Sequence, residues 1–476
     1  MEICELLRNL PVKSIQNHQS IDVKGIAFDS REVREGFLFV CLKGEKSDGH
    51  EHISEAQRNG AVAVMTERST ETELMQIIVK DTRRSLALVS ANFYGNPADD
   101  LAIVTVVGTN GKTSTVEILS EIFLAAGRKC ATIGTLGYKI GRERYDGCLT
   151  TPDPIELHKN LANMQKSGVE FVFVEASAHA IHFEKLAGIK AKSTVFTNLT
   201  QDHLDFFHTM EEYANVKLGY FNLNNTALAV VNSDDPYGRR ILMEQKVPTI
   251  TYGIDNPADV FAINVEEGEE GLRFTINAFD RIEEIRTPLF GRFNVYNVMA
   301  AISTAMYLGV GLPVAKMALE KMHTVPGRFS AKIMKGRKVV VDYAHTPDGL
   351  QNLLGSFVGR KGKLITVFGC GGDRDRSKRP LMGKIAARYS DHVIITDDNP
   401  RSEDEMDIAR EIKQGISPKN SVEICLNRKE AILRAFAVSA PGDIVVIAGK
   451  GHEKYMEIKG KKIPYSDAAI LEELNR

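Results

Sequence analysis

Short apolar runs rich in β-branched residues alternate with helical patterns along almost the whole chain. The runs predicted to be strands are residues 37–42, 61–66, 101–107, 170–175, 192–197, 227–231, 338–343, 364–369, 392–396 and 443–448. Because parallel strands are joined by crossover connections that are usually helices, this alternation predicts an α/β fold. Residues 257–279 break the alternation, since two strand-like runs flank EEGEEG and predict an antiparallel hairpin in or beside the larger sheet.

Two turn clusters divide the chain into three pieces. Gly95-Asn96-Pro97 precedes the strand at 101–107, and Val325-Pro326-Gly327 follows an expected helix near 293–309. The chain has 476 residues, which corresponds to about three domains of roughly 150 residues each. We therefore expect domains at residues 1–97, 98–325 and 326–476.

Composition excludes several classes of protein. The chain carries 60 Lys+Arg against 62 Asp+Glu, a net charge of −2, which argues against general binding to nucleic acid or to acidic membranes. No apolar run approaches the ~18 residues that span a bilayer, and the N-terminal MEICELLRNL does not resemble a signal peptide. The cysteines form no CxxC and fit reduced thiols: Cys4, Cys41, Cys130, Cys148, Cys370 and Cys425. We expect a cytoplasmic protein that binds neither nucleic acid nor membranes, and we expect it to be a monomer.

The sequence VTVVGTNGKTS at 104–114 predicts a phosphate-binding loop. It leads from a predicted strand through GxxGKT into a helix whose apolar residues recur at helical spacing. Glycines let backbone N–H groups approach phosphate oxygens, Lys112 can reach the β- and γ-phosphates, and Thr113 offers a hydroxyl to Mg²⁺. Val106 stands where a full P-loop has its first glycine, so only the shorter form is present. The segment predicts binding of a nucleoside triphosphate through Gly108, Thr109, Asn110, Gly111, Lys112, Thr113 and Ser114.

This loop is one of an ordered series of motifs that resembles the Mur ligase family, ATP-dependent amide-forming enzymes of peptidoglycan precursor synthesis. In chain order the motifs are DSREV (29–33), LKGEKSDGH (42–50), GTNGKTS (108–114), TTPDP (150–154), NLTQDHLD (198–205), EEYANVK (211–217), NSDD (232–235), GRFNVYN (291–297), PGR (326–328), VDYAHTPDGL (341–350), FGCGGDRDRSKRP (368–380), DNPR (398–401) and AGKGHE (448–453). The resemblance implies three domains: an N-terminal α/β domain that binds UDP, a central P-loop-type ATPase domain with a parallel sheet, and a C-terminal Rossmann-like domain that binds an amino acid.

Within the family, the motifs are most similar to those of the members that add meso-diaminopimelate to UDP-N-acetylmuramoyl-L-alanyl-D-glutamate through an acyl phosphate. DNPR looks like the motif of diaminopimelate-using members, whereas lysine-adding members differ there. Arg401 can pair bidentately with the carboxylate at the far end of diaminopimelate, where lysine has only an ammonium group. The resemblance implies an amino-acid site at Asp398, Asn399, Pro400, Arg401, Gly449 and Glu453. Loops after C-terminal strands, where α/β proteins usually bind ligands, add His345, Arg374, Lys378 and Arg379.

The resemblance also implies the residues that serve ATP and Mg²⁺. Thr113, Glu175 and His203 match metal ligands, although a lone histidine is more often packed or hydrogen-bonded. Lys217 matches a carbamylated lysine (N6-carboxylysine) that holds Mg²⁺, whereas its composition alone would make it a solvated helix lysine. The expected catalytic residues are thus Lys112, Glu175, His203 and Lys217. Asn294, Arg328 and Asp342 match nucleotide-binding positions, and Asp342 could instead cap the following turn.

Further residues match family positions that contact the nucleotide-sugar substrate, and the clearest departures from the family pattern also lie on the substrate side. Ser30 and Asp48-Gly49-His50 match the uridine-binding segment, and Thr150, Thr151, Ser177 and Lys185 match positions near the muramoyl part. The departures are Phe183 where a glutamine is expected, Lys185 for an arginine, Phe207 for a histidine and Ser330 for a glutamate.

These departures leave alternatives open. A paralogue with the same mechanism but a different substrate is the first of them, and a non-catalytic nucleotide-binding homologue is the second. A folylpolyglutamate synthase or a transport or motor ATPase fits the motifs less well.

Overall fold

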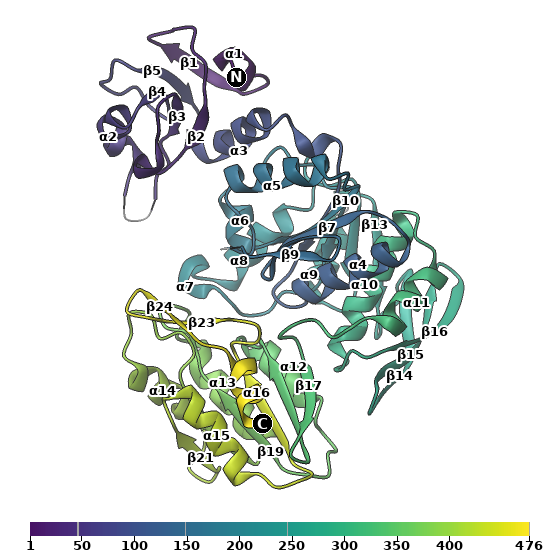
Figure 1. Ribbon diagram of the computed structural model, residues 1–476. Helices are drawn as coiled ribbons and strands as arrows, with labels where there is room; N and C mark the ends of the chain where they lie inside the picture. The colour runs from purple at the N-terminus through teal and green to yellow at the C-terminus, as the bar shows by residue number, and fades with distance from the viewer. Residues whose placement is uncertain (45–46, 148, 245, 476) are drawn as a thin grey trace.

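The computed structural model describes residues 1–44, 47–147, 149–244 and 246–475. Glu45 and Lys46 of the expected uridine-binding segment lie outside the described residues, and so does Cys148. Three sheets follow one another along the chain and from top to bottom of Figure 1, each flanked by helices, which confirms the predicted α/β class. The described cysteines are free thiols, as the sequence predicts. Among the described residues, no helix has both the length and the hydropathy to cross a membrane.

The N-terminal sheet has the strand order β1-β5-β4-β3-β2. Its strands are β1 (Val12–Gln16), β2 (Gly25–Ala27), β3 (Phe37–Val40), β4 (Ala61–Thr66) and β5 (Met75–Val79). β2 to β5 are parallel, whereas β1 pairs with β5 antiparallel at the edge. The helices are α1 (Ile3–Leu6), α2 (Ile53–Arg58) and α3 (Thr82–Phe93). Ile155 of the central region packs against this core and links the two parts.

The central sheet has the order β16-β15-β14-β13-β12-β11-β6-β10-β7-β8-β9. The strands are β6 (Ala102–Val107), β7 (Cys130–Gly134), β8 (Gly137–Ile140), β9 (Glu143–Tyr145), β10 (Phe171–Ala176), β11 (Ser193–Phe196), β12 (Ala229–Asn232), β13 (Thr249–Gly253), β14 (Val260–Gly268), β15 (Gly271–Ala278) and β16 (Arg281–Thr287). The parallel strands β14 to β7 form its middle, and antiparallel pairs extend both edges. The predicted hairpin is β14–β15, which joins the sheet through β13 and gains β16 as a further strand.

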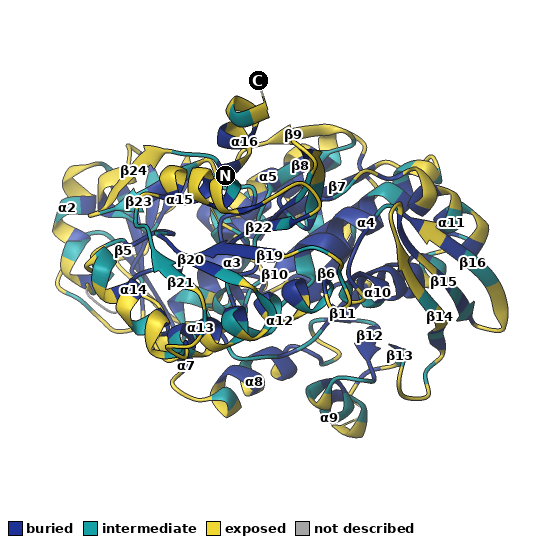
Figure 2. Cartoon of the chain, turned by 90° about the horizontal axis from the view of Figure 1, so that it is seen from below, coloured by how far each residue is buried: buried dark blue, intermediate teal, exposed yellow. Residues whose placement is uncertain are grey.

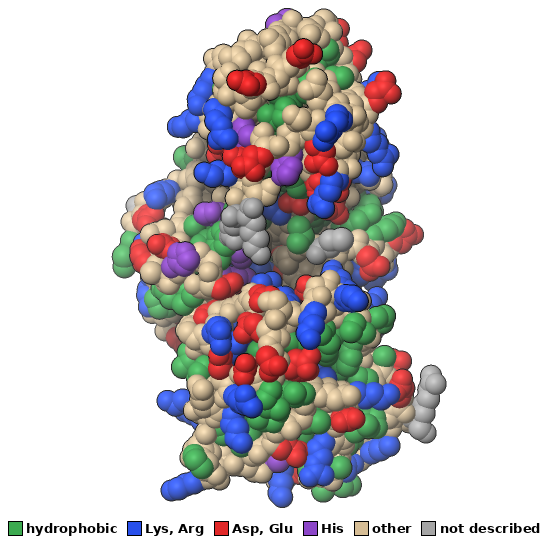
Figure 3. Space-filling model, turned by 90° about the vertical axis from the view of Figure 1, so that its left-hand side faces the viewer, with side chains coloured by type: hydrophobic (Ala, Val, Ile, Leu, Met, Phe, Trp, Pro, Cys, Tyr) green, Lys and Arg blue, Asp and Glu red, His purple; other side chains and the backbone are tan. Residues whose placement is uncertain are grey.

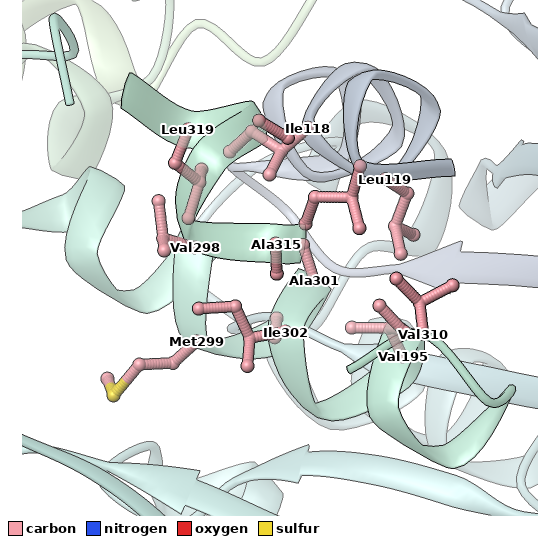
Figure 4. Close-up of a cluster of buried hydrophobic side chains, with 14 of the residues drawn as sticks. Ile118, Leu119, Val195, Val298, Met299, Ala301, Ile302, Val310, Ala315 and Leu319 are labelled. Carbon is pink, nitrogen blue, oxygen red and sulfur yellow. The ribbon is translucent and has the colours of Figure 1, made fainter. Parts of the chain in front are cut away.

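Helices cover both faces of the central sheet. They are α4 (Lys112–Ala125), α5 (Pro154–Lys166), α6 (Ala178–His182), α7 (Leu204–Phe207), α8 (Met210–Gly219), α9 (Pro236–Glu244), α10 (Phe293–Tyr307) and α11 (Leu312–Lys321). On one face, Ile118 and Leu119 of α4 pack against Ala301 of α10 and Leu319 of α11 (Figure 4). On the other face, α5 and α8 bury their apolar sides. Burial of these apolar faces fixes α4, and with it the loop that precedes α4, on the sheet.

The C-terminal sheet has the order β17-β18-β22-β19-β20-β21. Its strands are β17 (Ser330–Met334), β18 (Arg337–Asp342), β19 (Leu364–Phe368), β20 (His392–Ile395), β21 (Val422–Ile424) and β22 (Ile444–Ala448), and β23 (Tyr455–Ile458) and β24 (Lys461–Pro464) form a separate ribbon. The helices are α12 (Pro347–Gly355), α13 (Lys378–Tyr389), α14 (Glu405–Gln414), α15 (Arg428–Val438) and α16 (Asp467–Asn475). β18 to β21 are parallel. Their carboxyl ends therefore lie at one edge, where the loops with the predicted motifs emerge.

Burial follows the layers. Figure 2 shows the inner strands of the sheets as dark blue interior elements, with exposed residues on the outer sides of the helices. Other strands, such as β14 and β24, carry exposed residues. All ten predicted strands are present, within about two residues at each end.

Candidate active site

A cavity of about 920 Å³ lies between the central and C-terminal sheets. In Figure 3 the surface is hollowed where the upper and lower parts of the molecule meet. The phosphate loop, the carboxyl end of β10 and the segment 198–205 line it from the central side, and the loops after β18, β19, β20 and β22 line it from the other. Most of the predicted ATP and amino-acid residues thus converge on one cavity.

The phosphate loop needs its glycines for close packing. Gly111 caps the N-terminus of α4 with φ +84°, and a Cβ there would overlap the side-chain oxygen of Asn297. A Cβ at Gly108 would overlap the Thr197 hydroxyl. Lys112 Nζ donates hydrogen bonds to the carbonyls of Gly108 (3.0 Å) and Thr109 (2.8 Å). Burial lowers the pKa of Lys112, although the charge of Glu175 opposes this shift.

The Thr113 hydroxyl links three segments. It donates a hydrogen bond to Glu175 Oε2 (3.0 Å) and accepts one from Arg328 Nη2 (2.9 Å). Glu175 is the penultimate residue of β10 and is buried. It also accepts hydrogen bonds from the backbone N–H (2.8 Å) and hydroxyl (3.0 Å) of Thr135. Thr113 and Glu175 therefore offer adjacent oxygen ligands of the kind that Mg²⁺ prefers. Within the described ranges, no three or more His, Cys, Asp or Glu side chains are grouped so that they could hold a metal by themselves.

Asp202 is the buried anion at the centre of the segment 198–205. Lys378 Nζ and His203 Nε2 each lie 3.3 Å from its carboxylate, and His345 Nε2 lies 3.8 Å away. Burial opposes the ionised form, yet the positive charge of Lys378 lowers the pKa of Asp202 far below its usual range. His203 has the positive φ of +57°, and burial lowers its pKa to about 3. His203 is therefore neutral near pH 7, as a metal-ligating imidazole must be.

Lys217 on α8 is buried at 1% exposure, which overturns the solvated-lysine interpretation. Its Nζ donates a hydrogen bond to the Tyr213 hydroxyl and lies 4.2 Å from the centre of that ring. The same hydroxyl is 3.1 Å from Thr109 Oγ1 of the phosphate loop. Burial, followed by the charge of Lys112, lowers the pKa of Lys217 well below its ordinary value. Among the described residues, those that line the cavity include neither Lys217 nor Tyr213.

Asn294 and Asp342 use their side chains within the fold. Asn294 Nδ2 donates to the Phe290 carbonyl (2.7 Å), and its Oδ1 accepts from Asn297 Nδ2 (2.9 Å). Asn297, one helical turn later on α10, lines the cavity instead. Asp342 lines the cavity while its two oxygens accept backbone N–H groups of Phe329 and Ala344, each at 2.7 Å. The turn-capping interpretation of Asp342 therefore describes its contacts, and burial raises its pKa.

The predicted amino-acid residues meet where β20 and β22 end. Asn399 Nδ2 donates to Glu453 Oε2 (2.9 Å), and Lys450 Nζ donates to both Asn399 Oδ1 (3.1 Å) and Glu453 Oε2 (2.7 Å). Arg401 donates from Nη1 to the Gly372 carbonyl (2.7 Å) and from Nε to Glu457 Oε2 (3.2 Å). Asp398, Asn399, Arg401, Gly449 and Glu453 line the cavity, whereas Pro400 is buried beside it.

The basic cluster at 374–379 separates into two groups. Arg374 and Lys378 line the cavity, as does His345. Arg379 does not, because its fully buried guanidinium pairs with Glu403 and Glu411, each at 2.8 Å. The expectation that Arg379 is a ligand-binding loop residue is therefore wrong: it is the first turn of α13, held by two carboxylates.

The residues predicted to contact the muramoyl part line the central side of the cavity. Thr151 Oγ1 donates to the Glu175 carbonyl (2.6 Å) and accepts from the backbone N–H of Ser177 (3.1 Å). Thr150 Oγ1 lies 3.2 Å from Thr135 Oγ1, and Lys185 Nζ lies 2.7 Å from Asp153 Oδ1. Phe183, one of the departures, lines the same wall with His179. It belongs to an aromatic cluster that also contains the departure Phe207, together with His182 and Phe206.

The predicted uridine residues lie in short 3-10 turns beside the N-terminal sheet and do not line this cavity. Asp48 Oδ1 accepts hydrogen bonds from the backbone N–H (3.0 Å) and the Nδ1–H (2.6 Å) of His50, and His50 Nε2 accepts the backbone N–H of Glu67 (3.1 Å). Nδ1 of His50 therefore acts as a donor and Nε2 as an acceptor. Ser30 Oγ donates to Glu55 Oε2 (2.6 Å), and a Cβ at Gly49 would come within 2.8 Å of the Leu42 nitrogen.

Two cavity contacts were not predicted from the sequence. Asn297 stands in GRFNVYN three residues after Asn294, and the helical spacing alone could have named both. Asn110 Nδ2 donates to Asp348 Oδ2 (2.8 Å) across the two sheets, and Asp348 lies in the quoted motif VDYAHTPDGL.

Family models match three successive parts of the chain. The Mur ligase middle domain matches residues 106–305, the Mur ligase, glutamate ligase domain matches residues 327–451, and the Mur ligase family, catalytic domain matches residues 22–98. The UDP-N-acetylmuramoyl-L-alanyl-D-glutamate--2,6-diaminopimelate ligase of Syntrophomonas wolfei is 41% identical over 487 residues, covering 100% of this chain and 99% of that protein. The ligase of the same name from Bacillus velezensis is 41% identical over 490 residues, covering 100% of both chains.

Solved structures give the same result. The structure of a UDP-N-acetylmuramoyl-L-alanyl-D-glutamate--2,6-diaminopimelate ligase is 32% identical with a TM-score of 0.70, covering 100% of this chain and 98% of that one. MurF ligase from Thermotoga maritima in complex with ADP is 24% identical with a TM-score of 0.65, covering 90% of this chain and 94% of that one, and it shows the shared fold alone.

Proposed function

This chain belongs to the Mur ligase family, and we propose that it is the ATP-dependent ligase that adds meso-diaminopimelate to UDP-N-acetylmuramoyl-L-alanyl-D-glutamate in peptidoglycan synthesis. One observation carries this assignment beyond the family: a single cavity is lined by the phosphate loop and by Asp398, Arg401 and Glu453. A ligase needs the activating phosphate and the attacking amine at the same carboxylate, so both sets of residues must face one space.

The first step activates the carboxylate. One of its oxygens attacks the γ-phosphorus of ATP, the bond from that phosphorus to the β–γ bridging oxygen breaks, and ADP leaves, so that an acyl phosphate forms. Because both reactants are anions, the step depends on positioning and on positive charge. In this proposal Lys112, which contacts the phosphate-loop carbonyls, and Arg328, which contacts the Thr113 hydroxyl, supply that charge.

The second step forms the amide. The neutral amine of diaminopimelate attacks the acyl carbon, phosphate leaves with the oxygen that came from the carboxylate, and the nitrogen loses a proton. Arg401 and Glu453 line the wall that would hold the far end of the amino acid. Arg401 offers its guanidinium to a carboxylate, and Glu453 Oε1, whose nearest hydroxyl donor is Tyr343 at 3.5 Å, offers an acceptor to an ammonium group.

The residues around Thr113 fit a magnesium ion. Thr113 and Glu175 would hold it, because their adjacent oxygens leave room for phosphate oxygens as further ligands. Bound there, Mg²⁺ would neutralise charge on the transferring phosphate. We propose His203 as a further ligand, since its imidazole is neutral.

We also propose that Lys217 carries a carbamate. In that reaction the Nζ lone pair attacks CO₂, an N–C bond forms, and one N–H proton is released to water. Burial of Lys217 favours the reaction because only a neutral amine attacks, and burial holds the pKa of this lysine low. A carbamate on Lys217 would add oxygen ligands of the kind that Mg²⁺ prefers.

Each of the three parts of the chain binds a different substrate in this proposal. We propose that residues 1–97 bind UDP through Ser30, Asp48, Gly49 and His50, that residues 98–325 bind ATP, and that residues 326–476 bind the amino acid. We further propose that the protein is a cytoplasmic monomer that binds neither nucleic acid nor membranes. The net charge of −2 supports the lack of general binding to nucleic acid and to acidic membranes.

Phe183, Lys185 and Phe207 favour one alternative, a paralogue with the same mechanism but another carboxylate substrate. Phosphate release is measured with UDP-N-acetylmuramoyl-L-alanyl-D-glutamate and ATP, with meso-diaminopimelate or L-lysine as the amine. The proposal predicts release with diaminopimelate only. Preference for lysine would overturn the amino-acid assignment, and no release with either amine would favour the paralogue.

A further inference from the structure

Arg428, a residue outside every motif that points to the active site, connects the two loops that carry the amino-acid residues. It begins α15, and its side chain has 0% exposure. Nη1 donates to the Asp397 carbonyl (3.1 Å), and Nη2 donates to the Ala448 carbonyl (2.9 Å). These carbonyls immediately precede Asp398 and Gly449, where the two loops begin.

The partner of Arg428 comes from the C-terminal helix. Nε and Nη2 donate to the two oxygens of Asp467, each at 2.9 Å, and Asp467 also has 0% exposure. The Tyr465 hydroxyl donates to Asp467 Oδ1 at 2.9 Å. α16 packs on α15 through Ile470 and Leu471, and the two helices are neighbours in Figure 1. The C-terminal helix is thus connected to both loops through one guanidinium group.

The spacing of these loops matters because each supplies part of one site. β20 and β22 are separated in the sheet by β19. The loops that follow them are therefore not held together by direct pairing of the two strands. Asn399 of the first loop nevertheless donates to Glu453 of the second at 2.9 Å, and a Cβ at Gly449 would come within 2.5 Å of Asp398 Oδ2. Small shifts between the loops would break these contacts.

Stability alone does not account for this pair. Removing two charges from water costs about as much as their attraction returns, so a buried Arg–Asp pair adds little net stability. Its distinctive property is geometric, since the planar guanidinium binds a carboxylate bidentately while it also reaches two backbone carbonyls in fixed directions. Lysine keeps the charge but cannot reproduce this geometry.

We propose that Arg428, held by Asp467, is a positioning residue that sets the distance between the Asp398–Arg401 and Gly449–Glu453 loops and thereby determines affinity for the amino-acid substrate. The inference rests on the proposed function, because that function assigns the amino acid to these loops. It also gives α16 a role in the reaction although α16 contributes no residue to the cavity.

The test compares Arg428→Lys with Arg360→Lys. Arg360 is a matched control because it also binds an aspartate, Asp391 (2.7 Å), and a backbone carbonyl, that of Tyr389 (3.0 Å), but at the amino end of the same sheet. KM is measured for diaminopimelate, ATP and the UDP-linked substrate, and thermal melting checks the fold. We expect Arg428→Lys to raise KM for diaminopimelate about tenfold or more, with the other two KM values within about twofold and all values unchanged in Arg360→Lys.

Two results would overturn the inference: a KM for diaminopimelate within about twofold of the control, or an equal rise in all three KM values. If Arg428→Lys does not fold, Tyr465→Phe replaces it, with an expected rise of about threefold for diaminopimelate alone and no rise as the contrary result. The wild-type enzyme is assayed first. Failure of the wild type to use diaminopimelate would count against the proposed function, whereas a normal wild type with an unchanged variant would count against the role of Arg428.

Discussion

Arg328 Nη2 donates a 2.9 Å hydrogen bond to Thr113 Oγ1, although the two residues are 215 positions apart. Arg328 precedes the C-terminal sheet, and Thr113 is the hydroxyl residue of the phosphate loop on the central sheet. The same hydroxyl donates to Glu175 Oε2. A residue from outside the central sheet therefore completes the surroundings of the nucleotide loop, which connects the positions of the two parts to the phosphoryl-transfer step.

The first prediction concerns this contact. Arg328→Lys should lower kcat/KM for ATP by about 10²-fold, because a positively charged fork beside the transferring phosphate is lost. Release of ADP under saturating dipeptide and amino acid measures the effect. Arg273→Lys, a change in an exposed pair with Glu284, serves as the control. An unchanged kcat/KM for ATP in Arg328→Lys would show that Arg328 does not act on the nucleotide.

The second prediction tests the carbamate. Lys217→Ala should reduce kcat by about 10²-fold, and short carboxylic acids should restore part of the activity by replacing the missing anion. Wild-type protein equilibrated with ¹³C-bicarbonate should give a carbamate signal in ¹³C NMR that Lys217→Ala lacks. Exposed Lys190 supplies the control variant Lys190→Ala, which should keep both the signal and the activity. Full activity of Lys217→Ala would contradict the proposal that a carbamate on Lys217 takes part in the reaction.

The third prediction concerns the buried pair of Asp202 and Lys378, whose side chains are 8% and 5% exposed. Lys378→Met should destabilise the protein by about 3–5 kcal/mol, because it leaves a buried carboxylate without its main partner. Adding Asp202→Asn should recover part of that loss. The midpoints of urea unfolding measure both effects at pH 7. If the double variant is less stable than Lys378→Met, charge pairing is not what connects these two residues.

The fourth prediction is a pH dependence that comes from His158 on α5. Both ring nitrogens of this buried residue lack hydrogen-bond partners among the described residues, and burial lowers its pKa to about 4. An unfolded histidine has a pKa near 6.5, so above that pH the residue is neutral in both states. Its protonation then makes no contribution to the free energy of unfolding. As pH falls from about 6.5 to about 4, only the unfolded chain takes up the proton, and stability should fall by up to about 3 kcal/mol.

The matched variants for this effect are His158→Leu and His18→Leu, since His18 is exposed. The difference between urea midpoints at pH 7.5 and pH 4.5 should shrink in His158→Leu and stay unchanged in His18→Leu. Equal pH dependence in both variants would show that His158 is not the source.

Hydrophobic patterns in the sequence predicted those strands whose buried residues form a continuous apolar run. Ten parallel strands were found because buried parallel strands read as continuous apolar runs, whereas the parallel strands β2, β5, β7, β13 and β21 were missed. The short exposed strands β9 and β24 were missed, because every residue in them faces solvent and no hydrophobic pattern marks them. β5 was missed although it is fully buried, and its apolar run MQIIV could have been read as a strand.

Site residues divide in the same way. The phosphate loop was recognisable because strand, glycines, lysine and helix are contiguous. The choice between Asn294 and Asn297 was not, since it depends on how α10 is rotated against α4. The burial of Arg379 depends on Glu403 and Glu411, which lie more than 20 residues further along the chain, so a cluster of basic residues alone could not separate it from Arg374.

The most direct test of the proposed acyl-phosphate reaction follows the oxygen of the substrate carboxylate. UDP-N-acetylmuramoyl-L-alanyl-D-glutamate labelled with ¹⁸O in the glutamate carboxylate that reacts is incubated with the protein, ATP, Mg²⁺ and meso-diaminopimelate, and both products are analysed by mass spectrometry. The acyl-phosphate mechanism predicts one ¹⁸O in each phosphate released and an amide product that has gained diaminopimelate and lost that one label. Phosphate without ¹⁸O, or no amide product, would contradict it.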